Sequence, residues 1–566
     1  MFILDHDDSA PLYVQLYTQV RDRVLTGELP AGTRLPSVRH LAGELGVSRN
    51  TVDTAYLELI AEGFLLTRPR SGFFVAPVDR HQAFRAGMEP VPATAGAGPH
   101  RPHARPAAAH DRVHGGVPSG DVQDGASPSP YRFDFHPARL DAACFPLPLW
   151  RTYTLECLRE APRDLAEYGD PQGDPELRRA IGDYLQRSRG VVCTPDRVIV
   201  CAGLQHGLEI VADLMTGVSP NAGADAAGTQ AGQGAARPLV VGVENPGYPL
   251  PRAVFRNRGI PVVPVPVGPE GMDVDALAQS RCTLAYVTPS HQFPLGHVMP
   301  VHNRLRLIHW AREGGNVIIE DDYDSELRYA GTPVPSMQGL YPARLAGLAG
   351  RAGLAGPDWQ DGQDGQDGAV VYTGTFSKIL SPALRTSYMV LPPALLEVYR
   401  QRHRHYHAMV PLLEQRVLAR FMARGHWDRH VRRMRTVYRQ RHDAMLRAID
   451  AHFGGRATVI GQGAGLHVVV RLHGTDADER ELAIRAERAG IRLLPFSETR
   501  LTASPEAFRS DAPARPPAAP PDDHPDGYPD TSGDGPLLLL GFGGMPPDEL
   551  EQGVAQLHRA CFPHVR

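Results

Sequence analysis

The first 78 residues show a hydrophobic pattern that begins with one amphipathic helix. Apolar side chains recur every four residues, at Leu12, Leu16, Val20 and Val24. This recurrence places the four side chains on one face of an α-helix. The pattern therefore predicts a helix that packs this face against the rest of a small domain.

Two further helices and two strands are predicted after it. Ser37 precedes a short apolar pattern and is a suitable N-cap, and Ser48 begins another pattern after a turn at Gly46. The runs 63–66 and 72–75 predict two short strands. Helix, helix, tight turn, helix and β-wing is the order of a winged helix-turn-helix, which we expect to occupy residues 1–78.

From residue 131 onward the pattern changes to that of an α/β domain. Short β-branched runs alternate with longer helical stretches, and the runs are 198–200, 239–243, 284–287, 317–319 and 370–372. Such alternation predicts βαβ units, in which helices cover both faces of a mostly parallel sheet. We expect this α/β domain to occupy residues 131–566.

Four stretches lack hydrophobic periodicity and are rich in Gly, Ala, Pro, Asp and Gln. They lie at 79–130 and near 219–237, 343–368 and 503–535. Such compositions bury too little apolar surface to offset the entropy lost on ordering, so disorder is expected. The first stretch is interpreted as a linker between two domains, and the other three as insertions in surface loops.

Residues able to contact DNA gather on the predicted third helix and the wing. Phosphates attract cations, and base edges pair with forked donors such as Arg and Asn. The candidates are Ser48, Arg49, Asn50, Thr51 and Thr54 on the third helix, Arg39 on the second helix, and Arg68 and Arg70 at the wing tip. Residues 1–80 contain 8 Arg against 10 Asp plus Glu, so composition alone leaves a merely solvated surface as an alternative.

A motif in this region resembles the GntR-type winged helix over residues 11–76. It reads Leu-Pro-Ser-Val-Arg-x-Leu-Ala-x-x-Leu-Gly-Val-Ser-Arg-Asn-Thr-Val, followed by Ala-Tyr-x-x-Leu and Glu-Gly-Phe. The resemblance implies double-stranded promoter DNA as partner. Asp53 departs from the family, since some members carry a DNA-contacting Arg there. By this resemblance, Arg39 and Arg49 would contact phosphates and base edges, and the wing around Gly72 would approach the minor groove. Ser48, Asn50 and Thr51 would position the recognition helix.

Composition argues against a globally basic nucleic-acid coat and against a membrane anchor. The 566 residues carry a net charge of −4, and no apolar run approaches the roughly 18 residues of a membrane span. The first residues are acidic and lack a signal-peptide core. Six cysteines form no C-x-x-C pair, so neither a metal site nor a disulfide framework is indicated. We expect a protein of the reducing cytoplasm.

The chain contains a single lysine, Lys378. Lysine plus arginine total 59, so arginine supplies the other 58. Arginine replaces lysine in most ion pairs, but its guanidinium keeps its proton and cannot form a Schiff base with an aldehyde. A retained lysine therefore favours chemistry of the pyridoxal 5'-phosphate (PLP) type. Taken alone, the count is equally consistent with codon bias and one chance survivor.

Several residues near Lys378 or at predicted strand ends can bind the cofactor's phosphate. Thr375 offers a hydroxyl, and Arg385 offers a guanidinium that can grip phosphate in bidentate fashion. Gly203 stands between a predicted strand and helix, where the backbone amides of Leu204 and Gln205 would face an anion at the helix start.

Three other residues can bind the cofactor's ring. Asp321 follows a predicted buried strand and can pair with the pyridinium nitrogen, Tyr323 can hydrogen-bond the phenolate oxygen, and Tyr248 can stack on the ring. Each residue taken singly has an ordinary structural explanation. Their joint order along the chain favours a PLP site in which Lys378 is the catalytic amine.

From about residue 131 to 566 the chain resembles fold-type I aminotransferases. The matching motifs are Tyr-Gly-Asp-Pro-x-Gly (168–173), Thr-Pro-Ser-His-Gln-Phe-Pro-Leu-Gly (288–296) and Gly-Thr-Phe-Ser-Lys (374–378). The stretch 425–435 fits one branch of this family, the MocR-like regulators, in which a GntR winged helix is fused to an aminotransferase-like domain. The chain most resembles this branch, because the winged helix precedes its aminotransferase-like region. That resemblance implies a homodimeric transcriptional regulator whose PLP domain senses an amine, an amino acid or PLP itself.

Two departures from the family bear on the ligand. Aminotransferases hold the substrate α-carboxylate with an Arg near the C-terminus, and the motif 537–545 places Leu539 at that position. GABA-sensing members carry an Arg two residues after the stacking Tyr, where this chain has Leu250. Both departures argue against ordinary amino-acid transamination, although Arg252 or a residue of a partner subunit could substitute for the missing cation.

The sequence leaves two other interpretations of the chain open. The chain could be an active PLP-dependent aminotransferase with an accessory DNA-binding head, because the whole cofactor set is present. It could also be a degenerate fusion that no longer binds PLP.

Overall fold

The computed structural model describes two folded regions and leaves out most of the low-complexity sequence. The described residues are 2, 4, 12–26, 28–61, 64–68, 72–75, 131–160, 166–216, 237–329, 334–340, 369–461, 463–501 and 535–563. The predicted linker at 79–130 and nearly all of the three predicted insertions lie outside these ranges. Within them, no helix is both long and apolar enough to cross a membrane.

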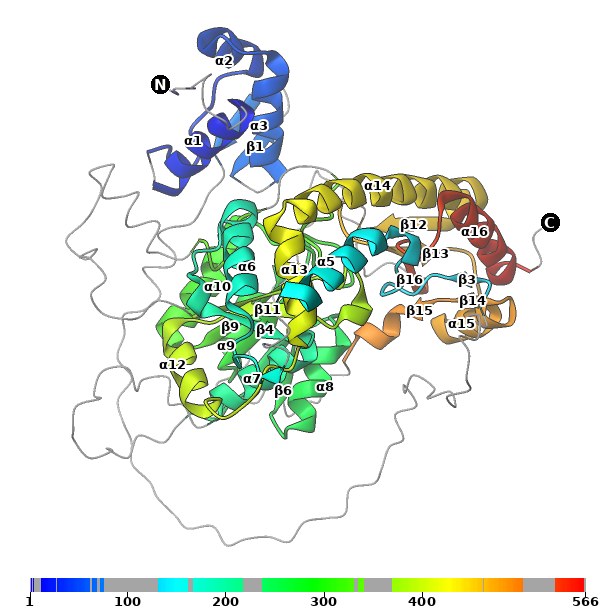
Figure 1. The fold of residues 1–566 in the computed structure, drawn as a ribbon. Coiled ribbons are helices and arrows are strands. Elements are labelled where there is room, and N and C mark those ends of the chain that lie inside the picture. Colours follow the sequence, from blue (N-terminus) through cyan, green and yellow to red (C-terminus); the bar gives the residue numbers. More distant parts are fainter. Residues whose placement is uncertain are drawn as a thin grey trace, which may run out of the picture.

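The N-terminal region folds as predicted into three helices and a two-stranded wing. Its elements are α1 (Leu12–Thr26), α2 (Val38–Leu45), α3 (Arg49–Ala61), β1 (Leu65–Arg68) and β2 (Gly72–Val75) (Figure 1). Leu16, Val20 and Val24 of the predicted stripe are buried. Ser37 caps α2 by accepting a hydrogen bond from the amide of His40.

The wing differs slightly from the prediction. The first strand begins at Leu65, two residues later than the run 63–66 suggested, and it continues to Arg68. β1 and β2 pair antiparallel from Leu65 opposite Val75 to Arg68 opposite Gly72. The extra residues are strand because their backbone groups find partners in β2, a pairing that hydrophobicity alone does not reveal.

The second region is built on an eight-stranded sheet with the order β4-β11-β10-β9-β8-β5-β6-β7. Its strands are β4 (Val198–Cys201), β5 (Val241–Asn245), β6 (Val262–Gly268), β7 (Gly271–Met272), β8 (Leu284–Val287), β9 (Val317–Asp322), β10 (Val370–Thr375) and β11 (Ser387–Val390). β10, β9, β8, β5 and β6 run parallel to one another, whereas β11 is antiparallel to both β4 and β10, and β7 is antiparallel to β6. The α/β prediction is confirmed, and each of the five predicted runs corresponds to a strand.

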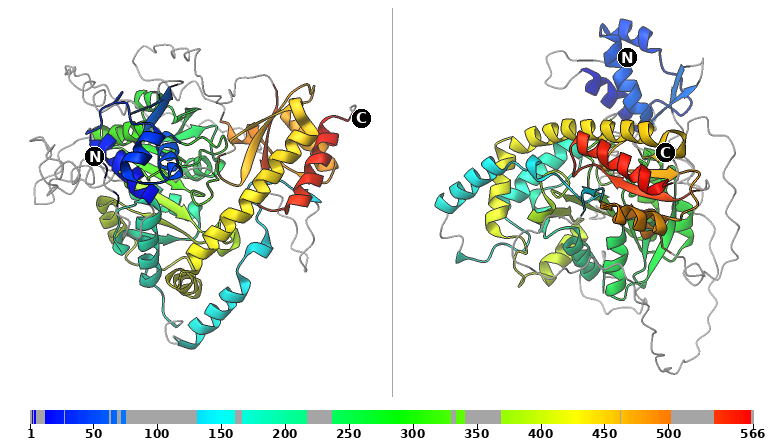
Figure 2. Two further views of the ribbon diagram at one scale, coloured as in Figure 1. Left: turned by 90° about the horizontal axis from the view of Figure 1, so that it is seen from above. Right: turned by 90° about the vertical axis from the view of Figure 1, so that its right-hand side faces the viewer.

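Helices cover both faces of this sheet (Figures 1 and 2). One face packs against α7 (Leu204–Met215), α8 (Pro249–Asn257) and α12 (Pro393–Arg402). The other face packs against α6 (Pro175–Arg189), α9 (Val274–Gln279), α10 (Val301–Gly314) and α13 (Leu412–Ala423), with α5 (Leu147–Glu160) outside them. Both faces are therefore buried, which explains the near-continuous apolar runs of the strands.

A smaller α/β unit follows along the chain. The long helix α14 (His426–Phe453) leads into an antiparallel sheet of order β12-β13-β16-β15. Its remaining elements are β12 (Ala457–Ile460), β13 (His467–Leu472), α15 (Glu479–Arg488), β14 (Ile491–Arg492), β15 (Leu494–Pro495), β16 (Leu537–Gly541) and α16 (Pro547–Cys561), with β3 (Phe133–Asp134) paired to β14. Figure 2 shows α16 lying along α14.

Candidate functional site

Strand register brings the predicted phosphate-binding residues together at one edge of the large sheet. Ser387, the first residue of β11, is paired with Thr375 at the end of β10 and with Cys201 at the end of β4. The turns that follow β4 and β10 must therefore lie on either side of β11. These two turns contain Gly203 and Lys378, which are 175 residues apart in the sequence.

Lys378 lies in the turn that follows β10, and its amine is 5.9 Å from the ring centre of Tyr323. Burial lowers the pKa of Lys378 from its usual value, while the charges of Asp324 and Asp321 act in the opposite direction. A lowered pKa increases the fraction of neutral amine, which is the form that attacks an aldehyde.

The guanidinium of Arg385 occupies the space where a side chain at Gly203 would lie. A Cβ atom placed on Gly203 would be 2.2 Å from Nη2 of Arg385, and the φ angle of Gly203 is 84°. Arg385 itself has a φ of 47°, the one positive value among the described non-glycine residues. Strained backbone of this kind persists where the surrounding structure fixes it, commonly at functional sites.

This contact places a cation directly at the start of helix α7. Leu204 and Gln205 are the first two residues of α7, where backbone N–H groups have no acceptor within the helix. Thr375 stands at the end of β10, and its hydroxyl accepts a hydrogen bond from the amide of Ser377 at 3.1 Å. Free amides, a helix dipole and a guanidinium together form an anion-binding cradle.

Asp321 is buried at the carboxyl end of β9 between two hydrogen-bond donors. Tyr286 of β8 donates its hydroxyl proton to Oδ2, and Thr373 of β10 donates to Oδ1 at 3.1 Å. Burial raises the pKa of Asp321 to about 7, although both hydrogen bonds act to lower it. Such a carboxyl group is suited to a cationic partner, since a pyridinium would favour its ionised form.

Tyr323 is held by a histidine–aspartate pair that the sequence patterns did not single out. Its hydroxyl donates to the backbone carbonyl of His291 at 2.9 Å, and Nδ1 of His291 lies 2.8 Å from Oδ2 of Asp324. Nε2 of His291 and Oδ1 of Asp324 are buried and lack hydrogen-bond partners in the part of the chain that the structure describes. Gly465 leaves room for this pair, because a Cβ there would lie 2.1 Å from the imidazole.

Tyr248 stands at the start of α8 with 39% of its surface exposed. Its ring meets that of Phe293 edge to face, with centres 5.4 Å apart. The face of the ring is therefore not used in stacking on Phe293. Of the predicted ring-binding residues, Asp321 and Tyr323 already have protein partners for their polar atoms.

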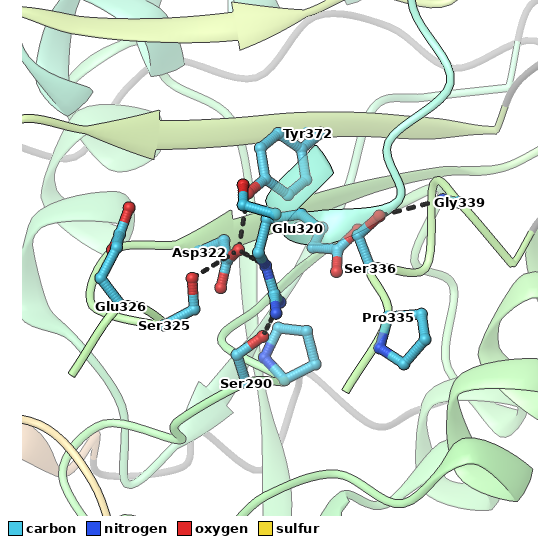
Figure 3. A network of polar contacts seen from close by, with 12 residues as sticks. Ser290, Glu320, Asp322, Ser325, Glu326, Pro335, Ser336, Gly339 and Tyr372 are labelled. Carbon is cyan, nitrogen blue, oxygen red and sulfur yellow. Dashed lines mark hydrogen bonds and ion pairs between the residues drawn. The ribbon is translucent and has the colours of Figure 1, made fainter. Parts of the chain in front are cut away.

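A buried ionic network lies on the opposite face of the strand that carries Asp321. Side chains alternate along β9, so Glu320 and Asp322 lie on the face opposite Asp321. Figure 3 shows these two side chains among their partners. Asp322 accepts hydrogen bonds from Arg189 at 2.5 Å, from Tyr372 at 2.6 Å and from Ser325 at 3.0 Å. Burial acts to raise the pKa of Asp322, but the charge of Arg189 together with the hydrogen bonds that Asp322 accepts holds that pKa below its usual value.

A second buried arginine completes this network. Arg304 of α10 donates to the backbone carbonyls of Met299, Pro335 and Pro289, and its guanidinium lies 3.8 Å from Glu320. The network thus ties helices α6 and α10 to the strand that positions Asp321. Sequence periodicity could not identify it, because buried arginines resemble surface arginines in any hydrophobicity pattern.

The structure offers no carboxylate clamp at the positions considered from the sequence. Leu539 is fully buried in β16, and Leu250, near the start of α8, packs partly buried against the apolar core. Arg252, the other cation considered, is held against a neighbouring segment of this chain. Its guanidinium donates to the backbone carbonyls of Arg500 at 2.9 Å and Glu498 at 2.5 Å.

The DNA-contacting candidates that the structure describes lie on α2, at the start of α3 and on the wing. Arg39, Arg49 and Gly72 are exposed. Ser48 and Thr51 also have a local role, since the Ser48 hydroxyl accepts from the Thr51 amide at 3.1 Å and lies 2.9 Å from the Thr51 hydroxyl. Ser48 is therefore the N-cap of α3. Arg70 and the side chains of Asn50, Thr54 and Arg68 lie outside the described residues.

The large domain fits PLP on geometric grounds. An amine, an anion cradle and a buried carboxyl group meet at one edge of the sheet, and the cradle depends on the missing side chain of Gly203. When bound, PLP supplies an aldehyde for Lys378 and an electron-withdrawing ring. Among the described residues, no group of His, Cys, Asp and Glu is arranged to hold a metal ion.

Comparison with known families gives a match for each region. Residues 12–75 match the family described as bacterial regulatory proteins, gntR family, and residues 139–518 match aminotransferase class I and II. The chain is 34% identical to the uncharacterized HTH-type transcriptional regulator YdeL of Bacillus subtilis, over 86% of this chain and 89% of YdeL. It is 33% identical to the probable rhizopine catabolism regulatory protein MocR of Rhizobium meliloti, over 89% of this chain and 90% of MocR.

Solved structures support the fold of the second region. A multiple substrate aminotransferase from Thermococcus profundus superposes with a TM-score of 0.58 at 21% identity, covering 77% of this chain and 92% of the aminotransferase. At this identity the similarity concerns the fold.

Proposed function

The chain belongs to the MocR-type regulators, in which a gntR-family winged helix is joined to an aminotransferase class I and II domain, and on this premise we propose that PLP bound at Lys378 controls its binding to promoter DNA. The observation that carries the proposal is the contact between Arg385 and Gly203. It forms an anion cradle beside the sole lysine of a chain whose other domain is a DNA-binding fold.

In this proposal each residue of the site has a separate task. Lys378 forms the covalent bond to the cofactor, Asp321 pairs with the pyridinium, and Tyr248 covers the ring. Tyr323 donates its hydroxyl proton to the phenolate oxygen in place of the His291 carbonyl. The phosphate is held by Thr375, Arg385 and the α7 start at Gly203, Leu204 and Gln205. On the DNA side, Arg39, Arg49 and the wing carry the phosphate and base contacts, and Ser48 fixes the start of the recognition helix.

The effector is proposed to be an amine without a carboxylate, or PLP itself. Two features support this choice: Leu539 is buried in apolar surroundings, and the guanidinium of Arg252 is already bonded to backbone carbonyls. An α-amino acid would bring its carboxylate to this side without a fixed cation from the described part of the chain. Binding such a charge without a partner is costly.

Regulation requires that the ligand prefer one of two arrangements of the protein. A ligand shifts an equilibrium only by its difference in affinity for the two states. We propose a cytoplasmic homodimer in which loading the PLP site changes how the two winged helices engage DNA. Free and loaded forms would then differ in operator affinity.

The experiment that tests this function is footprinting of the DNA beside the protein's own gene. Purified full-length protein is expected to protect a specific segment, and the protected pattern is expected to change when PLP or candidate amines are added. Absence of protection at any protein concentration that leaves unrelated DNA free would contradict the proposal.

Turnover is the second candidate function, because the cofactor-binding set is complete. An active aminotransferase would consume an amino donor and a keto acid in a steady reaction. Purified protein with PLP, mixed with amino acids and 2-oxoglutarate, distinguishes the two. Sustained formation of a new amino acid would favour the enzyme, and binding of an amine without turnover would favour the regulator.

A further inference from the structure

Helix α14 presents an arginine-rich face that neither the cofactor site nor the winged helix uses. The helix contains seven arginines and three aspartates. Trp427, Met434, Tyr438, Met445 and Ile449 lie on its buried face. The exposed arginines are Arg429, Arg432, Arg433, Arg439 and Arg447, which we term the α14 basic face.

These five side chains form one continuous strip. At 3.6 residues per turn they fall within an arc of about 120°, opposite the buried residues. From Arg429 to Arg447 the strip is about 27 Å long at 1.5 Å per residue. Figures 1 and 2 show α14 as a long helix on the outside of its domain.

The charges of the strip are largely unopposed. The guanidinium groups of Arg432 and Arg433 make no hydrogen bond or ion pair with any residue that the structure describes. Arg429 donates to the carbonyls of Gly425 and Arg424, and Arg439 to that of Tyr329, so both keep their full charge without an acidic partner. Asp443 lies on the same face, four residues from both Arg439 and Arg447, but it contacts His442 at 3.1 Å and makes no ion pair with either arginine.

Some arginines at the surface of the same domain are paired with acids, whereas the exposed Arg151, Arg159 and Arg179 have no ion pair with any residue that the structure describes. Arg258 pairs with Asp213 at 2.8 Å, and Arg485 pairs with Glu481 at 3.0 Å. Arg306 likewise contacts Asp275. The α14 basic face is distinguished by its clustering, because five exposed arginines without an acidic partner among the described residues share one face of a single helix in a chain of net charge −4.

We propose that the α14 basic face contacts the phosphate backbone of DNA outside the segment read by the winged helix. This inference rests on the proposed DNA-binding function. DNA is the favoured partner because residues 1–80 hold 8 Arg against 10 acidic residues, so the winged helix provides little general attraction for phosphate. A second copy of the same face would be repelled, and a strip without exposed apolar residues offers nothing to insert into a membrane.

The test uses full-length protein carrying both Arg432→Gln and Arg433→Gln. Its affinity is measured against salt concentration on two DNAs: the footprinted segment alone, and the same segment extended by about 15 base pairs on each side. On the long DNA the slope of log K against log salt should fall by about 0.9 for each phosphate that is no longer neutralised, and affinity at low salt should fall about tenfold. On the short DNA both quantities should match the parent.

A matched control removes two positive charges from arginines outside α14. The variant with Arg258→Gln and Arg306→Gln should keep the parent slope on both DNAs, since acids already neutralise these arginines. Unaltered melting temperatures establish that all variants fold.

Three results would overturn the inference. These are a parent-like slope on long DNA, an equal decrease in affinity on short and long DNA, and a change in the mass of the particle in solution, which would make this face an interface between copies. If the parent protein bound neither DNA, the proposed function itself would fail instead.

Discussion

Gly203 is the residue whose replacement most directly probes the anion cradle. The variant Gly203→Ala adds a methyl group 2.2 Å from the Arg385 guanidinium, at a φ of 84° that side chains avoid. Arg385 must then move away from the start of α7. We expect PLP to bind at least about tenfold more weakly, equal to about 1.4 kcal/mol, in a titration followed by absorbance.

Gly268→Ala is the matched control for this change, because nothing lies within 4 Å of its added Cβ. It should bind PLP as the parent does. Equal PLP affinity in Gly203→Ala and the parent would show that the phosphate is not held between Arg385 and α7.

Asp321 gives the cofactor-free protein a specific dependence on pH. Burial raises the pKa of Asp321 to about 7, whereas an unfolded chain has a value of about 4. Between these values the folded state holds a proton that the unfolded state has released, so stability falls as pH rises through this window. Asp321→Asn removes this titration.

The variant Asp321→Asn should therefore gain stability relative to the parent as pH rises from about 5 to about 8, by roughly 2–3 kcal/mol. Urea unfolding of both proteins at several pH values measures the difference. Glu320 also has a pKa of about 7, but it titrates in both proteins and cancels. Glu244 titrates in both as well, and since the charge of Asp321 contributes to its raised pKa, the change at Glu244 is part of the measured difference. A difference that stays constant with pH would contradict the assignment.

Single residues with unusual chemistry could be predicted from the sequence, but their partners could not. Lys378 stood out because it is the only lysine, and Asp321 because it ends an apolar run. Tyr286 and Thr373 reach Asp321 from β8 and β10, which flank β9 in the sheet. Strand order is a property of the folded sheet, and no local pattern contains it.

The strand β9 depends on the ionic network behind it for its position. Arg189→Met would leave Asp322 buried without its cation, which typically costs about 3–5 kcal/mol in the free energy of unfolding. Adding Asp322→Asn removes the stranded charge. The double variant should therefore lose clearly less stability than the sum of the two single variants in urea unfolding.

Arg306→Met provides the comparison for an exposed ion pair, and it should change stability by less than about 1 kcal/mol. Additive effects of Arg189→Met and Asp322→Asn would mean that the two side chains do not act as a pair.

Helices and strands followed the sequence pattern where packing and local signals agree. The second helix begins after its Ser37 cap and ends at Gly46, which adopts a φ of 66°. Strand boundaries differ from the predicted ones where pairing with a neighbouring strand sets them. β1 begins two residues after the predicted run at 63, and β5 begins two residues after the predicted run at 239. The motif alignment already placed Leu539 at the position where aminotransferases carry the carboxylate-binding Arg. The hydrogen bonds from Arg252 to the carbonyls of residues 498 and 500 could not be predicted, because they depend on the fold.

The two regions together join a DNA-reading fold to a cofactor site within one chain. Neither region alone accounts for the arrangement, because a transaminase needs no winged helix and a simple repressor needs no Schiff-base lysine. The joint presence of both is the reason to interpret Lys378 as the anchor of a sensor.

The most direct measurement is the affinity of the parent and of Lys378→Ala for the footprinted DNA, each with and without PLP. We predict that PLP changes the affinity of the parent several-fold and leaves that of Lys378→Ala unchanged, while both proteins fold and bind DNA. An equal response of the two proteins to PLP, or no response of a parent that binds both PLP and DNA, would contradict control of DNA binding through Lys378.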